Sequence, residues 1–146
     1  MAAERPAEPA LGYLLSDVVR LMKRDFHERA TGLGLTPALA RLLFHVHRVP
    51  GSHQTELAHR LDVTPVTLCR MLDRLVARGY VRRQPDPRDR RAMRIYVAVR
   101  GEPLVARMAR IADQTGARAL RGIAARERTA LVRTLGKLAD NLSAGS

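Results

Sequence analysis

Aromatic residues and cysteine are scarce in this chain of 146 residues, which has no Trp, two Phe, three Tyr and a single Cys. One cysteine cannot form an intramolecular disulfide, so the composition fits a protein of the reducing cytoplasm. Because aromatic side chains are so few, the core has to consist mainly of Leu, Val and Ala. Such a core suits a helical fold.

Long hydrophobic runs are also absent. No stretch approaches the ~20 apolar residues that a membrane-spanning helix needs, so we expect no membrane partner. Residues 1–10, MAAERPAEPA, lack the apolar centre and the cleavage pattern of a secretory signal, and we interpret them as a disordered tail. The protein is therefore predicted to act in the cytoplasm.

Motifs of catalysis and metal binding are missing as well. The chain has no G-x-S-x-G, no P-loop, no H-E-x-x-H and no carboxylate pair on one face, so neither an enzyme nor a cofactor is expected. His45 and His47 lie two positions apart on a predicted helix and point about 200° from each other. His53 and His59 are six apart and also lie on different faces, so no metal site is predicted.

Positive charge, in contrast, is abundant. The 26 Lys and Arg exceed the 14 Asp and Glu and give a formal charge of +12, which attracts nucleic acid or an anionic membrane surface. All but Lys23 and Lys137 of these basic residues are Arg, whose planar fork suits phosphates and guanine edges. A genome that favours Arg codons would also produce this ratio, so the argument depends on where the arginines cluster.

Apolar residues recur at helical spacing through the first half of the chain. A first helix over residues 11–31 carries one apolar face, made of Leu11, Leu14, Leu15, Val18, Met22 and Phe26. Thr36-Pro37 and Thr64-Pro65 are each a capping residue followed by Pro, and they begin helices that run to about residues 49 and 78. A short helix over residues 54–61 lies between them. Two short helices separated by about three residues are typical of a helix-turn-helix.

The periodicity changes after Gly79. The apolar residues Met93, Ile95, Val97 and Val99 alternate with Arg94, Tyr96, Ala98 and Arg100, which predicts a half-buried strand paired with residues 80–84. Residues 85–91, PDPRDRR, form a polar hairpin tip, so the hairpin is a wing. A fifth helix starts at residue 102. The last, over about residues 126–142, has heptad-like spacing of Leu131, Leu135, Leu138 and Leu142.

The predicted fold class is therefore mainly α with a small β-hairpin wing (α+β). A winged helix-turn-helix module spans residues 35–100, and dimerisation helices span residues 11–34 and 101–146. The apolar faces of these flanking helices are too long for such a module to cover, and exposed Leu stripes mark an interface. We expect a homodimer whose reading helices lie ~34–36 Å apart on a pseudo-palindromic DNA site.

The helix that starts after Thr64 has the two faces of a DNA reader. Leu68, Leu72, Leu75 and Val76 gather on one side, with Met71 at its edge. Arg70 and Arg74 lie opposite, where Arg can pair with guanine and an apolar side chain can meet a thymine methyl. The predicted contacts of the helix-turn-helix are Gln54, Thr64, Pro65, Val66, Thr67, Arg70 and Arg74. An ordinary solvated amphipathic helix would carry some of these residues too.

The hairpin holds the densest charge in the chain. Six arginines lie within thirteen residues: Arg82, Arg83, Arg88, Arg90, Arg91 and Arg94. A narrow A·T minor groove has an enhanced negative potential that draws in Arg, while other arginines bind phosphates. Asp89 repels DNA, so we expect it to orient a neighbouring Arg through an ion pair. The predicted wing contacts are Arg88, Asp89, Arg90, Arg91 and Arg94.

The chain resembles the MarR family of multiple antibiotic resistance regulators. The motifs that carry the resemblance are LTP at residues 35–37, QTELA at 54–58, LDRL at 72–75, RGYV at 78–81 and, above all, DPRDRR at 86–91. The resemblance implies a triangular homodimer with intertwined first, fifth and sixth helices, a recognition helix from Thr64, and Arg91 in the minor groove. It also makes Asp89 and Arg90 an acidic–basic pair that braces the wing. His53, Cys69, Ala98 and Ala124 depart from the family pattern.

The resemblance further implies a small, often aromatic ligand in a crevice between the dimerisation helices and the winged module. Sequence position puts five residues near that region: Tyr13, Phe26, Phe44, His45 and His47. Phe26 and Phe44 also fall in apolar stripes, where they would be ordinary core residues. The predicted function is a transcription regulator, and in particular a ligand-responsive repressor.

Two alternatives stay open at this point. Cys69 lies in the reading helix with Arg70 and Arg74, which favours a thiolate and hence a thiol-sensing regulator. An architectural DNA-binding protein without a ligand would carry the same charge and the same helices. It would show little preference between DNA sequences, whereas a regulator prefers its site ~10³-fold or more.

Overall fold

The computed structural model describes residues 10–144 and shows six α-helices and one small sheet in that part of the chain. The helices are α1 (Leu11–Arg29), α2 (Pro37–Arg48), α3 (Gln54–Leu61), α4 (Pro65–Ala77), α5 (Glu102–Ala119) and α6 (Ala125–Ser143). The strands are β1 (Ser52–His53), β2 (Val81–Pro85) and β3 (Met93–Val97). The predicted class, mainly α with a small wing, is confirmed. The predicted tail lies outside the described residues, apart from Ala10.

The helix ends follow from local chemistry. Thr36 and Thr64 are the N-caps of α2 and α4, and their hydroxyls accept the backbone N–H groups of Leu39 at 3.3 Å and Thr67 at 3.2 Å. Gly79, with φ of 72°, takes the left-handed conformation that ends α4. These caps confirm the sequence interpretation of both Thr-Pro pairs.

The sheet has three strands rather than the two that were predicted. Its order is β1-β3-β2 and both pairings are antiparallel, with Val81 opposite Val97 and Ser52 opposite Ile95. β1 has two residues, which is too short for an alternating pattern to appear. The prediction that Val99 faces inward is wrong, because β3 ends at Val97 and Val99 lies 82% exposed in a 3₁₀ turn.

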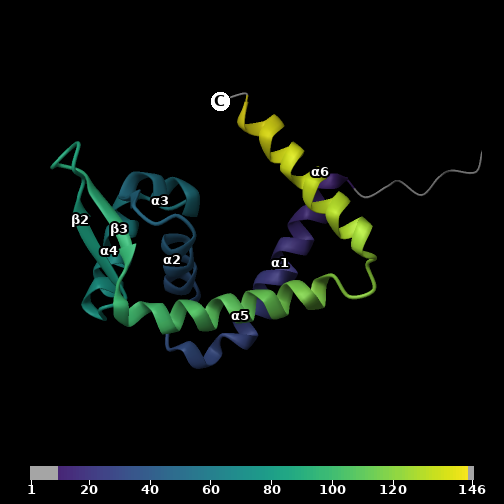
Figure 1. Ribbon diagram of the computed structural model, residues 1–146, viewed down its shortest axis with the longest axis horizontal. Coiled ribbons are helices and arrows are strands. Elements are labelled where there is room, and N and C mark those ends of the chain that lie inside the picture. The colour runs from purple at the N-terminus through teal and green to yellow at the C-terminus, as the bar shows by residue number, and fades with distance from the viewer. Residues whose placement is uncertain (1–9, 145–146) are drawn as a thin grey trace, which may run out of the picture.

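The core lies inside the winged module and at the first half of α5. Its fully buried side chains are Leu42, Leu43, Val46, Leu57, Leu68, Leu72, Leu75, Ile95 and Met108. Val76, which was expected on the inner face of α4, is 36% exposed and lies at the edge of that face. α5 runs from the module to the opposite side of the molecule, where α1 and α6 extend (Figure 1). Neither α1 nor α6 has a buried residue.

Candidate nucleic-acid interface and effector crevice

The helix-turn-helix consists of α3, a turn and α4. Asp62 makes the turn with φ of 54°, a left-handed conformation that Asp tolerates. Leu68, Leu72 and Leu75 are buried, and this burial fixes α4 on the core. The opposite face is solvent-accessible and carries the predicted contacts Thr64, Pro65, Val66, Thr67, Arg70 and Arg74, while Gln54 is half-buried at the start of α3. Each predicted reader is therefore available to a partner.

The six arginines of the wing fall into two groups. Three have intramolecular partners: Arg94 Nε donates to Asp86 at 2.9 Å, Arg83 Nη2 pairs with Asp73 at 2.8 Å, and Arg82 stacks on the Tyr96 ring at 4.6 Å. The other three, Arg88, Arg90 and Arg91, lie exposed at the tip and form no ion pair within residues 10–144. Arg94, predicted to contact DNA, is thus paired within the wing, whereas the three tip arginines form no such pair.

The expected ion pair between Asp89 and a neighbouring Arg is not formed. Asp89 accepts the backbone N–H of Arg91 at 3.0 Å and so shapes the turn itself. The carboxylate that does brace the wing is Asp86, which sequence reasoning missed. The signal for it was weak, because Asp86 and Asp89 look alike in a polar turn and only the fold shows which one is buried.

Asp86 is 4% exposed and accepts three hydrogen bonds. Its donors are the backbone N–H of Arg88 at 2.8 Å, His53 Nε2 at 2.6 Å and Arg94 Nε at 2.9 Å. These donors hold the pKa of the Asp86 carboxyl well below its usual range, the Arg88 N–H most strongly. In return, the carboxylate raises the pKa of Arg94.

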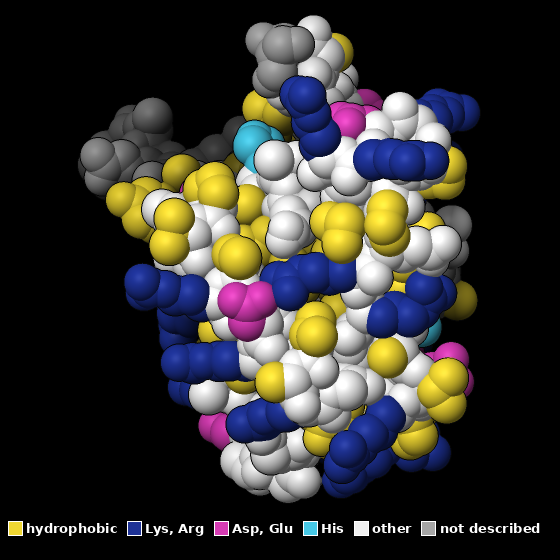
Figure 2. All heavy atoms as spheres, turned by 90° about the vertical axis from the view of Figure 1, so that its left-hand side faces the viewer, with side chains coloured by type: hydrophobic (Ala, Val, Ile, Leu, Met, Phe, Trp, Pro, Cys, Tyr) yellow, Lys and Arg dark blue, Asp and Glu magenta, His cyan; other side chains and the backbone are white. Residues whose placement is uncertain are grey.

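Positive charge dominates the face formed by the wing and the reading helix. Residues 35–100 contain thirteen Arg and five acidic residues. On the face in Figure 2, Lys and Arg side chains are spread over the surface and Asp and Glu are few. Such a face raises the local concentration of a polyanion and positions phosphates along it.

A largely apolar crevice of about 460 Å³ lies between α1, α2 and α5. Its lining includes Phe26, Phe44 and His45 of the predicted ligand residues, together with Met22 and Thr115. Tyr13 and His47 are not part of that lining. Tyr13 is 77% exposed near the start of α1, and His47 lies on the exposed side of α2. Three of the five residues that were predicted near the ligand therefore line this crevice.

Basic side chains also contribute to this crevice. Lys23, His27 and Arg41 also line it. The pKa of His45 is lowered, first by burial and then by the charges of Arg41, Arg60 and Arg48. The crevice thus combines apolar walls with a positive potential at its polar positions.

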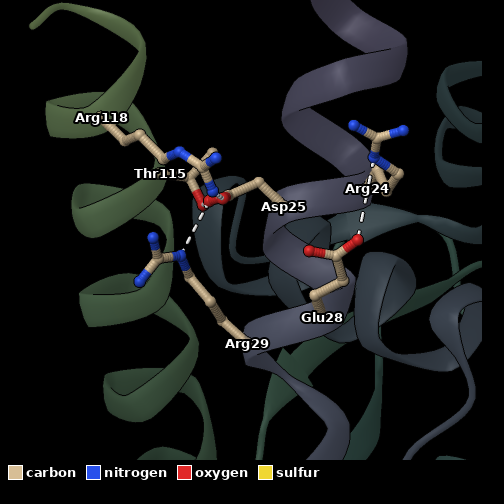
Figure 3. A network of polar contacts seen from close by, with 6 residues as sticks. All are labelled: Arg24, Asp25, Glu28, Arg29, Thr115 and Arg118. Carbon is tan, nitrogen blue, oxygen red and sulfur yellow. Dashed lines mark hydrogen bonds and ion pairs between the residues drawn. The ribbon is translucent and has the colours of Figure 1, made fainter.

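One polar network joins α1 to α5 beside the crevice (Figure 3). Asp25 on α1 accepts from Arg29 Nε at 2.8 Å and from the Thr115 hydroxyl at 2.7 Å, and it pairs with Arg118. Thr115 is 4% exposed. These partners, Arg29 first, lower the pKa of Asp25 to about 2. Because Thr115 also lines the crevice, a ligand there would lie next to the contact between the two helices.

The comparisons with known proteins agree with this architecture. A model of the MarR family matches residues 33–92. A MarR-family transcriptional regulator from Silicibacter pomeroyi is 30% identical, with a TM-score of 0.79 over 90% of this chain and 89% of its own. This chain belongs to the MarR family.

Two further MarR-type structures are similar. Wild-type MarR from E. coli in its apo form is 27% identical, with a TM-score of 0.75 over 92% of this chain and 98% of its own. The transcriptional repressor CouR, bound to a 23-mer DNA duplex, is 30% identical, with a TM-score of 0.71 over 88% of this chain and 92% of its own. The fold is thus that of DNA-binding transcription regulators, as the motifs indicated.

Within residues 10–144, no group of three His, Cys, Asp or Glu side chains could hold a metal ion. Cys69 is exposed on α4, and its Sγ donates to Asp73 Oδ2 at 4.0 Å. No described helix is long and apolar enough to cross a membrane.

Proposed function

We propose that this MarR-family protein is a sequence-specific regulator that binds double-stranded DNA as a homodimer and represses transcription until a small effector binds. The observation that carries the proposal is the shared face of α4 and the wing. There, the exposed side of a reading helix and three tip arginines without ion pairs all remain available to DNA. The DNA duplex bound by the similar repressor CouR supports the same partner here.

In this proposal α4 reads bases and the wing holds the flanks. The first turn of α4, from Thr64 to Thr67, enters the major groove, and Arg70 pairs with a guanine. Gln54 at the start of α3 contacts the backbone. Arg91 at the wing tip inserts into the minor groove, and Arg88 and Arg90 bind phosphates.

The flanking helices, within residues 11–34 and 101–146, support the proposed homodimer. Leu14, Val18 and Leu21 of α1 are each more than 40% exposed, and so are Leu131 and Leu142 of α6. Exposed apolar side chains along two helices without buried residues are typical of a subunit interface. A two-fold axis there would present two copies of the module 35–100 to one pseudo-palindromic operator.

The effector we propose is a small aromatic anion. The apolar walls of the crevice suit an aromatic ring, while Lys23 and Arg41 favour a negative charge. Benzoate and benzamide are matched probes, because they share their shape and differ in charge. Benzoate should release the protein from DNA at a lower concentration than benzamide, and equal potency would exclude charge recognition.

The decisive experiment titrates the purified protein with a duplex from upstream of its own gene and with a scrambled duplex, at two salt concentrations. A regulator should prefer the first by ~10³-fold or more. An architectural protein would bind both duplexes alike, with the same dependence on salt. That second result would overturn the proposed regulation while leaving DNA binding intact.

A further inference from the structure

We propose that Asp86 positions the wing for DNA, that His53 and Arg94 hold it in place, and that the charge on His53 adjusts this hold. We call these three residues the wing clasp. The inference rests on the proposed DNA binding, and it assigns a role to residues that do not themselves read DNA.

The wing clasp joins all three strands at the end of the sheet nearest the wing tip. Asp86 follows β2 directly, Arg94 lies in β3, and His53 lies in β1 opposite Arg94. One carboxylate oxygen, Asp86 Oδ2, accepts from both the imidazole at 2.6 Å and the guanidinium at 2.9 Å. The other oxygen, Asp86 Oδ1, accepts the backbone N–H of Arg88, which is the first of the three arginines at the wing tip. The position of the tip therefore depends on one buried carboxylate.

His53 connects the wing clasp to the reading module. It occupies the N-cap of α3, but its side chain makes no capping hydrogen bond and reaches Asp86 instead. The next residue, Gln54, is the proposed DNA contact of α3. The clasp therefore sets the spacing between the start of α3 and the wing tip, two points that have to meet the same duplex.

The His53 imidazole is the residue of the wing clasp whose charge can change with pH. Because Asp86 is ionised, it only accepts, so His53 Nε2 carries the hydrogen in this bond. A neutral ring keeps that single bond, whereas an imidazolium adds an ion pair with the carboxylate and a positive charge near DNA. Both additions favour the DNA-bound wing, so binding should tighten as the pH falls. The His53 side chain is 42% exposed, which lets protons reach it.

Other groups near His53 have to be considered in any pH profile. The titratable or charged residues on the elements packed against it are Asp86, Arg94 and Tyr96 of the wing strands and Glu56, His59 and Arg60 of α3. Glu56 is already paired with Arg60 at 3.1 Å. His59 is exposed on the same helix without belonging to the clasp, so it provides a matched control.

The test compares Asp86→Asn with Asp89→Asn, which change the net charge equally. Removing a negative charge beside phosphates should strengthen DNA binding, and Asp89→Asn should do so slightly. Asp86→Asn should instead weaken binding by about tenfold, because the buried pairing is lost. It should also speed hydrogen exchange of the Arg88 amide in the DNA-free protein. If Asp86→Asn binds like Asp89→Asn and exchanges like wild type, the proposal is wrong.

A second comparison isolates the proton. Affinity of wild type should rise about threefold from pH 8 to pH 6 at fixed ionic strength, and His53→Gln should abolish this rise while His59→Gln keeps it. Parallel profiles of wild type and His53→Gln would overturn the role of the charge. If wild type binds no duplex at all, the proposed function fails, and the exchange measurement still decides whether Asp86 holds the tip.

Discussion

Replacing Leu131 by Ala should weaken the proposed homodimer by about thirtyfold. Leu131 lies on the apolar stripe of α6 and is 44% exposed in the single chain. Complete burial of a Leu side chain contributes roughly 1.5–3 kcal/mol, so covering this remaining part contributes about 1 kcal/mol per protomer. Two-fold symmetry doubles the effect to about 2 kcal/mol, which corresponds to about thirtyfold in the dissociation constant.

Sedimentation velocity over a series of protein concentrations measures this change. Arg133→Ala is the matched control, because position 133 lies about 200° around α6 from position 131 and faces away from the stripe. This control substitution should leave the dissociation constant of the dimer unchanged. DNA binding gives a second readout, since Leu131→Ala should make operator binding more steeply dependent on protein concentration than it is in wild type.

Two results would refute this reasoning. A wild-type chain that stays monomeric at micromolar concentration would show that the stripe serves another purpose. Equal dissociation constants for the Leu131→Ala and Arg133→Ala dimers would show that the subunits meet elsewhere. The division of the chain into a DNA-reading module and dimerisation helices would then be wrong.

Three further predictions concern DNA reading and acid stability. Arg91→Ala should lose most affinity on operators with A·T-rich flanks in gel-shift titrations, and an equal loss on all sequences would reject insertion into the minor groove. Arg70→Ala should relax the preference for one base pair by ~1–3 kcal/mol, measured with single-substitution duplexes; an unchanged preference would reject Arg70 as a reader. Because the pKa of Asp25 is lowered from 3.8 to about 2, its carboxylate stabilises the folded chain above pH 4, and this contribution is lost as the pH falls towards 2. Thermal unfolding of Asp25→Asn should therefore depend less on pH in this range than that of wild type, and identical pH dependences would contradict the assignment.

Local chemistry made much of the fold predictable. The two Thr-Pro pairs define helix starts because a Thr side chain satisfies a free N–H and Pro tolerates the first helical position. Gly79 ends α4 because only a residue at ease with positive φ continues the chain there. Leu68, Leu72 and Leu75 recur at helical spacing, and all three are buried. Such features depend on neighbours within a few residues, which the sequence contains.

Features that depend on distant residues were missed. β1 exists because Ser52 and His53 pair with β3, some forty residues later. Asp86 is buried because His53 and Arg94 converge on it, and Arg94 is paired rather than free for the same reason. The crevice shows the same limit, since Met22 and Thr115 meet only after α1 packs on α5. Proximity in space, not residue type, decides each of these cases.

The junction between the wing and α5 carries a mechanical consequence. Gly101 lies against the Tyr80 carbonyl so closely that an added Cβ would approach its oxygen to 2.3 Å. This close contact joins the residue before β2 to the start of α5, so we expect the wing and α5 to move together. The 18 residues of α5 make a lever of about 27 Å. Over that length, a tilt of α5 by about 5° displaces one end relative to the other by about 2 Å. In the proposed homodimer, small motions at the subunit contact would therefore shift the wing by a distance that matters in a DNA groove.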